Sequence, residues 1–82
     1  MATVTMFASH SCRFCQQAIQ WIREHPDYAD RIQIRFIDEE KEAQQDCIQL
    51  GFRGVPAFVT QDDRWDGWEP SRLEQALQIL RS

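Results

Sequence analysis

The chain has 82 residues, of which 43% are hydrophobic and 27% are charged, and its formal net charge is −4. This length fits one small domain, and the composition excludes a collagen-like or intrinsically disordered chain. An acidic balance without clustered Lys or Arg argues against nucleic acid as a partner. No stretch reaches the ~18 consecutive apolar residues of a membrane span, and residues 1–8 lack the features of a signal peptide, so we expect a cytoplasmic protein.

The first half of the chain predicts a strand, a helix and a second strand. Residues 3–7 alternate β-branched and larger apolar side chains, as in a short strand. Apolar side chains then recur at helical spacing up to Pro26, which predicts a helix that begins beside Cys12. Residues 25–30 have the composition of a turn, and residues 31–38 predict a strand parallel to the first.

Residues 40–50 predict a second helix, with Gly51 placed as its C-terminal cap. An apolar stripe along this helix is formed by Ala43, Cys47, Ile48 and Leu50. We expect the thiol of Cys47 to be buried there as part of the core. Residues 56–60 and 64–65 flank a short polar turn and predict a β-hairpin whose first strand begins at a proline.

The last predicted helix has one apolar face, formed by Leu73, Ala76, Leu77 and Leu80. Either Pro70 at the first helical position or a capping box of Ser71 and Glu74 begins this helix. The element order is therefore βαβαββα. We predict an α/β fold with a four-stranded mixed sheet and three helices, in one domain that covers residues 1–82.

The stretch "CRFC" places Cys12 and Cys15 just after the first strand, with a spacing found in zinc sites and redox sites alike. Cys12 lies at a helix N-terminus, where free backbone N–H groups and the helix dipole stabilise a thiolate. Cys15 lies one helical turn further on and is shielded. We predict that Cys12 attacks a substrate disulfide and that Cys15 resolves the mixed disulfide.

A metal site is the alternative from a different functional class. Zinc takes four ligands, and the other candidates are Cys47, His10 and His25. These residues form neither a second Cys-x-x-Cys nor a His pair at zinc-finger spacing. We expect no metal, and a metal-binding or purely structural interaction module stays open as the alternative.

Other side chains beside the cysteine pair are candidates for tuning the thiol or for contacting a partner. His10 and Arg13 flank the pair, and a cation at either position stabilises the thiolate if its side chain turns inward. Arg13 and Phe14 lie at the mouth of the site, and Trp68 lies in the turn before the last helix, so each is a candidate for substrate binding. Trp65 ends a strand, and we expect it to be packed in the core.

The cysteine pair after the first strand, the "GVP" before the third strand and the βαβαββα order resemble the glutaredoxin-like branch of the thioredoxin superfamily over the whole chain. The stretches "GFRGVP" (51–56) and "WDGWEP" (65–70) are most similar to the NrdH-redoxin type, small electron donors to ribonucleotide reductase. The resemblance implies a thioredoxin-like fold. It also implies a dithiol–disulfide oxidoreductase that carries electrons to protein disulfides, such as that of ribonucleotide reductase.

This resemblance also assigns roles to residues. Cys12 matches the nucleophile, Cys15 matches the resolving thiol, and Pro56 matches a cis-proline that faces the disulfide. Val55 is expected to offer its backbone N–H and C=O to the incoming substrate, like a short extra strand. The redox-active group is then the Cys12–Cys15 disulfide itself, and no bound cofactor is expected.

The chain departs from glutathione-dependent glutaredoxins at their characteristic stretches. Such proteins usually carry Cys-Pro-Tyr-Cys, a lysine shortly before it and a Gly-Gly-x-Asp-Asp stretch that holds glutathione. Here the corresponding stretches are "CRFC", "ASHS" (8–11) and "WDGWEP". These departures and the acidic balance argue against glutathione, so we expect thioredoxin reductase as the electron source, with a glutathione-dependent glutaredoxin as the alternative. We expect a monomer, because a single small donor domain is most often monomeric.

Overall fold

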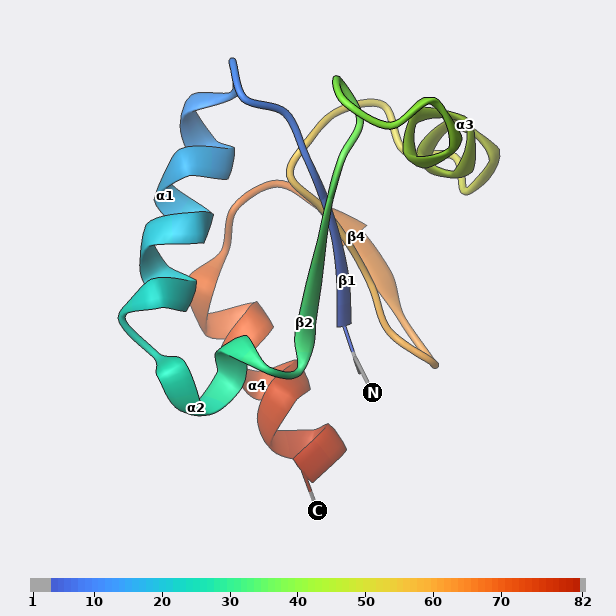
Figure 1. The fold of residues 1–82 in the computed structure, drawn as a ribbon. Coiled ribbons are helices and arrows are strands. Elements are labelled where there is room, and N and C mark those ends of the chain that lie inside the picture. The colour runs from blue at the N-terminus through green and yellow to red at the C-terminus, as the bar shows by residue number, and fades with distance from the viewer. Residues whose placement is uncertain (1–3, 82) are drawn as a thin grey trace.

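The structure, a computed structural model, describes residues 4–81 of the chain and the side chains of residues 4–78. The described residues form a four-stranded sheet with the strand order β2-β1-β3-β4 (Figure 1). The strands are β1 (Val4–Ala8), β2 (Ile32–Phe36), β3 (Ala57–Val59) and β4 (Arg64–Asp66). β1 pairs in parallel with β2 and antiparallel with β3, and β3 pairs antiparallel with β4. The predicted α/β fold with a mixed sheet is confirmed.

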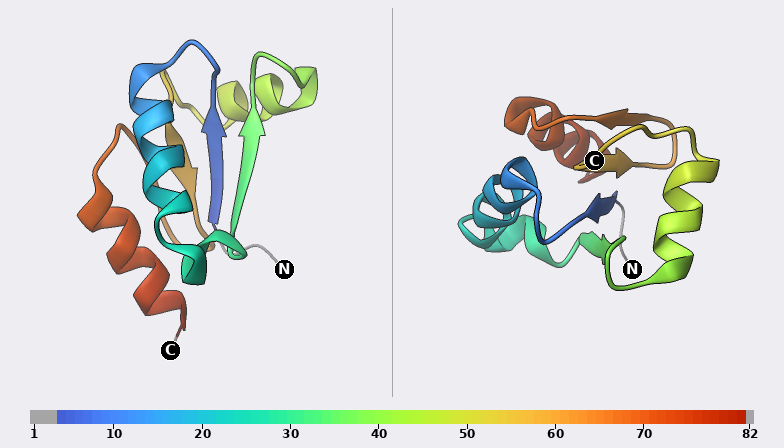
Figure 2. Two further views of the ribbon diagram at one scale, coloured as in Figure 1. Left: turned by 60° about the vertical axis from the view of Figure 1, so that its left-hand side comes forward. Right: turned by 90° about the horizontal axis from the view of Figure 1, so that it is seen from above.

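The helices are α1 (Arg13–Arg23), α2 (Pro26–Ala29), α3 (Lys41–Gln49) and α4 (Pro70–Arg81). α1 and α4 lie on one face of the sheet, and α3 lies on the other face (Figure 2). The sequence predicts three helices and a turn at residues 25–30, so the short α2 is an additional helix that was not predicted. It forms because Pro26 stands at the first helical position, where a missing N–H costs nothing, and Asp27 adds a negative charge to the first turn.

The remaining boundaries lie within a few residues of the predicted ones. β2 is shorter than the predicted strand at residues 31–38, and α4 begins at Pro70, the first of its two predicted starts. Residue 3 of the first predicted strand and the side chain of Leu80 lie outside the described residues. No helix within residues 4–81 is long and apolar enough to cross a membrane.

Two hydrophobic cores lie on the two faces of the sheet, because successive residues of β1 point to opposite faces. The larger core, shared with α1 and α4, is formed by Val4, Met6, Ala8, Cys15, Ala18, Ile22, Ile32, Phe58, Trp65, Leu73 and Leu77. The smaller core, shared with α3, is formed by Phe7, Ala43, Cys47 and Ala57. The predicted burial of Cys47 and Trp65 is confirmed.

The apolar stripe predicted for α3 is correct for Ala43 and Cys47 but wrong for Ile48. Ala43 and Cys47 stand four positions apart and both face the sheet. Ile48 follows one position later and is therefore rotated by about 100° around the helix axis. Its side chain points away from the sheet and is 66% exposed.

α3 ends at the predicted glycine. Gly51 has a φ of 87°, in the left-handed region where a side chain is strained. The N–H of Gly51 donates to the Ile48 carbonyl at 3.0 Å, and the N–H of Phe52 donates to the Cys47 carbonyl at 3.2 Å. This pair of bonds is a Schellman motif, which satisfies carbonyl groups at the end of the helix.

We predict that Gly51→Ala lowers the free energy of unfolding by about 1 to 2 kcal/mol, because an L-residue is disfavoured in the left-handed region. An added Cβ meets no atom within 4 Å at Gly51, so the cost is conformational. Gly54→Ala is the matched control, because Gly54 also has open space and does not have a positive φ. Urea denaturation measures both variants. Equal stability of the two variants would contradict the assignment of the cap.

Candidate active site

The cysteine pair lies where β1 passes into α1, at the edge of the sheet where the two parallel strands end (Figure 1). Cys12 is the N-cap of α1, with φ −90° and ψ 117°, and its side chain is half-buried. Cys15 is the third residue of the helix and is fully buried in the larger core. The predicted position of Cys12 at a helix N-terminus is therefore the observed one.

The two sulfur atoms have different surroundings. The Cys12 sulfur accepts the backbone N–H of Cys15 at 3.1 Å, as an N-cap side chain does, and it also lies 3.4 Å from the Val55 carbonyl oxygen. The pKa of the Cys15 thiol is raised to about 12. Burial is the largest cause, and the hydrogen bond with Cys12 is the second largest. Cys12 is thus the more accessible sulfur and has a backbone N–H donor within hydrogen-bond distance, whereas the Cys15 thiol keeps its proton near neutral pH.

A second segment reaches the same place from the other half of the chain. The Val55–Pro56 peptide bond is cis, as the family resemblance implies. Pro56 is fully buried, and its carbonyl oxygen accepts the N–H of Gly67 at 2.8 Å. Gly67 has a φ of 95°, a conformation that glycine adopts readily. The end of the β3–β4 hairpin therefore fixes the backbone that faces Cys12.

The three predicted substrate-binding side chains lie on the surface around the pair. Arg13 is exposed, Phe14 is 56% exposed, and Trp68 is half-buried with its ring edge-to-face against Trp21 at 6.0 Å. A groove of about 510 Å³ between α1 and the start of α4 is lined by Arg13, Gln16, Gln17, Gln20, Trp21, Glu24, Trp68 and Pro70. Trp68 packs against the core on one side and lines this groove on the other.

His10 makes its contacts with the segment that follows β2. Its Nδ1 lies 3.1 Å from both carboxylate oxygens of Asp38, and its Nε2 lies 3.6 Å from a Glu39 oxygen. The His10 ring stacks on Phe36, with the ring centroids 4.1 Å apart. The ring therefore does not turn inward to Cys12, as a direct stabilisation of the thiolate requires, and any influence of His10 on Cys12 acts through the loop.

Asp38 and Gln16 contact the active-site loop, residues 9–11 before Cys12, and neither residue stands out in the sequence. Asp38 accepts the backbone N–H of His10 at 3.0 Å, and the Gln16 side chain donates to the His10 carbonyl at 3.3 Å. In the sequence Asp38 is one of many acids between residues 38 and 46. The signal that could have identified Asp38 is its place just after the strand that runs parallel to β1, because parallel strands end at the same edge of the sheet.

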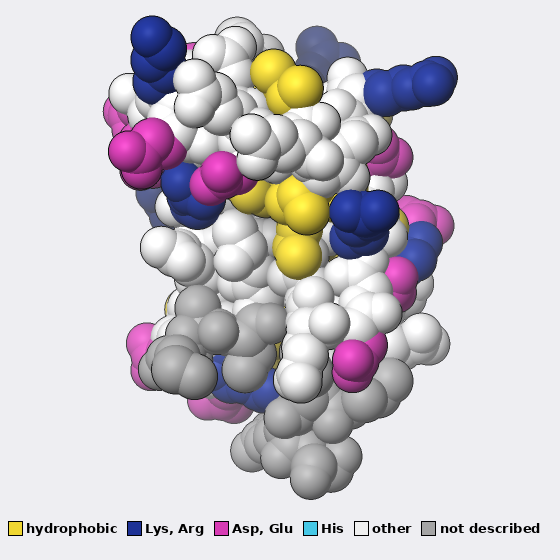
Figure 3. Space-filling model, turned by 90° about the vertical axis from the view of Figure 1, so that its right-hand side faces the viewer, with side chains coloured by type: hydrophobic (Ala, Val, Ile, Leu, Met, Phe, Trp, Pro, Cys, Tyr) yellow, Lys and Arg dark blue, Asp and Glu magenta, His cyan; other side chains and the backbone are white. Residues whose placement is uncertain are grey.

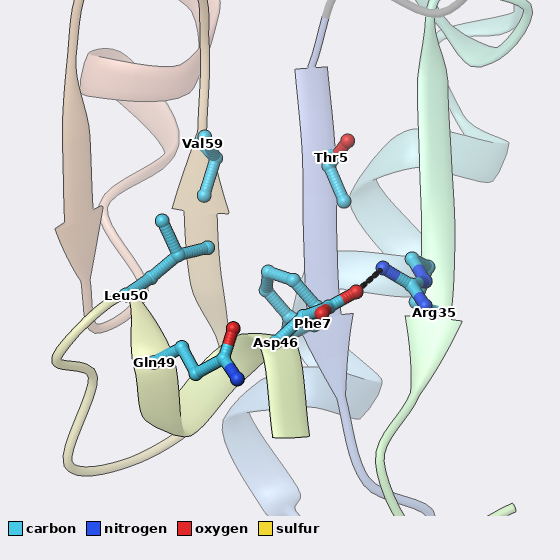
Figure 4. A pocket seen from close by; sticks show the side chains of 7 residues that line it. All are labelled: Thr5, Phe7, Arg35, Asp46, Gln49, Leu50 and Val59. Carbon is cyan, nitrogen blue, oxygen red and sulfur yellow. Dashed lines mark hydrogen bonds and ion pairs between the residues drawn. The ribbon is translucent and has the colours of Figure 1, made fainter. Parts of the chain in front are cut away.

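A separate pocket of about 470 Å³ lies on the α3 face of the sheet, and none of the three cysteines lines it. In Figure 3, hydrophobic side chains gather in the middle of this face, with charged side chains on either side. Arg35 and Asp46 meet there at 2.7 Å (Figure 4), and the guanidinium lies over the Phe7 ring at 5.6 Å. The opposite charges are matched to each other, so we interpret the pair as a structural link between β2 and α3.

Comparison with known proteins gives the family. The family model described as glutaredoxin matches residues 4–65 of the chain. The chain belongs to the glutaredoxin family. Among curated glutaredoxin-like proteins, it is 33% identical over 70 residues to the protein NrdH of Lactococcus lactis, and the match covers 85% of this chain and 93% of that protein.

Solved structures share the fold. The glutaredoxin from Archaeoglobus fulgidus superposes with a TM-score of 0.73 at 19% identity, over 94% of this chain and 87% of the other. The thioredoxin-like protein BC3987 gives a TM-score of 0.74 at 14% identity, over 89% of this chain and 97% of the other. The predicted thioredoxin-like fold is confirmed. As a glutaredoxin family member with a close cysteine pair, the protein is a thiol–disulfide oxidoreductase.

We predict that iodoacetamide labels Cys12 at least about tenfold faster than Cys15 or Cys47 in the folded, reduced protein at pH 7. Cys15 and Cys47 are buried, and burial raises the pKa of both thiols. Brief labelling followed by peptide mapping measures the three rates. Labelling in urea is the control, since unfolding exposes all three thiols. Equal rates in the folded protein would contradict the assigned difference between the sulfur atoms.

Proposed function

We propose that this glutaredoxin family member is a dithiol electron donor of the NrdH-redoxin type. It reduces protein disulfides, such as that of ribonucleotide reductase, and thioredoxin reductase recharges it. The observation that carries the proposal is the position of the Cys12 sulfur, 3.1 Å from the Cys15 nitrogen and 3.4 Å from the Val55 carbonyl oxygen. The match to the NrdH protein of Lactococcus lactis supports the redoxin type.

The proposed reaction begins at Cys12. Its thiolate attacks one sulfur of the substrate disulfide, a new bond forms between Cys12 and that sulfur, and the other substrate sulfur leaves as a thiolate. The Cys15 N–H, 3.1 Å from the Cys12 sulfur, stabilises the attacking anion. Cys12 is the attacking residue because the Cys15 thiol, with a pKa of about 12, stays protonated at neutral pH.

Cys15 completes the reaction. Its thiol loses a proton and attacks the Cys12 sulfur, so that the Cys12–Cys15 disulfide forms and the second substrate sulfur leaves as a thiolate. The substrate has then gained two electrons and the redoxin has lost two electrons and the Cys15 proton; the two substrate thiolates take up protons from the Cys15 thiol and from water. Thioredoxin reductase returns the two electrons in the next cycle. The reacting group is the cysteine pair itself, and we propose no bound cofactor.

The substrate-binding residues surround this pair. We assign substrate binding to Val55, whose backbone faces Cys12 and offers its N–H and C=O to an extended chain, and to Pro56, which follows Val55 across the cis bond. Phe14 and Arg13, both exposed beside Cys12, contact the partner protein directly. Trp68 lines the adjoining groove of about 510 Å³ and contacts partner residues further from the disulfide.

A glutathione-dependent glutaredoxin is the second candidate, because the matching family model is that of glutaredoxins. The stretch "WDGWEP" and the residues before Cys12 favour thioredoxin reductase instead, since they lack the usual glutathione-binding pattern. A metal-binding module is less favoured, because no group of three or more His, Cys, Asp or Glu residues within residues 4–81 is arranged so that it could hold a metal ion. We further propose a cytoplasmic monomer whose single domain covers residues 1–82.

We predict that the reduced protein supports NADPH-dependent reduction of insulin with thioredoxin reductase, and does so faster than with glutathione and glutathione reductase. Cys12→Ser and Cys15→Ser each lose the thioredoxin reductase-coupled activity, since one attacks and the other resolves. Ser is also a good N-cap, so Cys12→Ser is expected to stay folded. Initial rates of NADPH oxidation measure both couplings.

Cys47→Ala is the matched control for this assay, because Cys47 is a buried core residue of α3. Its rate is expected to stay close to that of the wild type once folding is verified by circular dichroism. Full activity of Cys15→Ser with glutathione and glutathione reductase would replace the redoxin assignment with a monothiol glutaredoxin. Stoichiometric zinc or iron and no free thiols in the purified protein would favour the metal-binding module.

A further inference from the structure

Asp38 belongs to a second loop that leaves the sheet beside the active-site loop. β1 and β2 pair in parallel as far as Ala8 and Phe36, and the N–H of Ile37 donates to the Ala8 carbonyl at 2.9 Å. Residues 9–11 and Asp38 therefore start from the same edge of the sheet, next to each other. Figure 2 shows both loops at this edge, above the ends of β1 and β2.

The Asp38 carboxylate binds His10 in two ways. One oxygen accepts the His10 backbone N–H at 3.0 Å, and both oxygens lie 3.1 Å from the ring nitrogen Nδ1. The hydrogen bond from the backbone N–H holds the pKa of the Asp38 carboxyl below its usual range, so the group is ionised near neutral pH. An ionised carboxylate only accepts hydrogen bonds, so Nδ1 carries the hydrogen. Stacking on Phe36 fixes the plane of the same ring.

The contacts between Asp38 and His10 lie close to Cys12 in the chain. His10 stands two residues before Cys12, and its carbonyl accepts a hydrogen bond from the Gln16 side chain at 3.3 Å. The N–H of Cys12 donates to the Ser9 carbonyl at 3.3 Å, so the loop closes on itself around His10. The bond to Asp38 thus connects this small loop to another part of the chain.

The charge of Asp38 works against the reaction, whereas its hydrogen bonds favour it. Burial is the main cause of the raised pKa of Cys15, and the negative charge of Asp38 adds a smaller part in the same direction. A carboxylate near the cysteine pair therefore disfavours a second negative charge there. The hydrogen bond to the loop backbone is a separate contribution, because it ties down the chain two residues before Cys12, the N-cap of α1.

We propose that Asp38 is a positioning residue for the thiol–disulfide exchange of the proposed function: it fixes the active-site loop through the His10 backbone, so that the Cys12 sulfur stays over the start of α1. The effect depends on an acceptor oxygen at position 38 and not on its charge. An acceptor without charge should therefore serve as well as the carboxylate.

Three variants separate the two contributions of this side chain. Asp38→Ala removes both acceptor and charge, and we expect it to lower the second-order rate of Cys12 alkylation by iodoacetamide at pH 7 about tenfold. Asp38→Asn keeps an acceptor oxygen, and its rate is expected to equal or exceed that of the wild type. Glu39→Gln is the matched control, since Glu39 is the neighbouring acid and contacts His10 through the ring alone, at 3.6 Å.

Urea denaturation of the same samples separates positioning from stability, because a purely structural role would lower stability without slowing alkylation of the folded protein. An Asp38→Ala rate equal to that of Glu39→Gln would overturn the proposal. A tenfold loss in Asp38→Asn would overturn it as well, and this test holds even if Asp38→Ala does not fold. Alkylation of Cys12 needs no partner protein, so it tests the role of Asp38 separately from the proposed function. If the wild type did not reduce insulin, the proposed function would be refuted, but the alkylation result for Asp38 would stand.

Discussion

The active site depends on one hydrogen bond, in which the Cys12 sulfur accepts the backbone N–H of Cys15 at the start of α1. An N-cap side chain satisfies a backbone donor that the helix itself leaves open. A thiolate does so with a full negative charge at the positive end of the helix dipole. The same geometry therefore begins the helix, leaves the Cys12 sulfur partly accessible and buries the Cys15 sulfur.

The fold brings separate segments of the chain close to the active-site cysteines. The parallel pairing of β1 and β2 places the loop before Cys12 beside Asp38, because both strands end at one edge of the sheet. The antiparallel β3 begins two residues after Val55, whose carbonyl lies 3.4 Å from the sulfur, and the bond from Gly67 holds the backbone after Val55. Helices α1 and α4 then form the groove beside the pair.

Features set by local spacing could be predicted from the sequence, and features set by tertiary contacts could not. The N-cap position of Cys12, the cap at Gly51 and the burial of Cys47 each follow from a pattern within one helix. The exposure of Ile48 depends on which way α3 faces the sheet, and the contact between His10 and Asp38 spans 28 residues. The cis bond before Pro56 was expected from the family resemblance, because local sequence alone does not favour it.

The most direct test of this account is to trap the mixed disulfide. A Cys15→Ser variant cannot resolve the intermediate, so incubation of its reduced form with insulin should produce a covalent adduct that reductant reverses. Peptide mapping by mass spectrometry should locate the adduct at Cys12, with Cys47 unmodified. An adduct at Cys47, or no adduct at all with the folded variant, would contradict the role of the Cys12 sulfur as the attacking group.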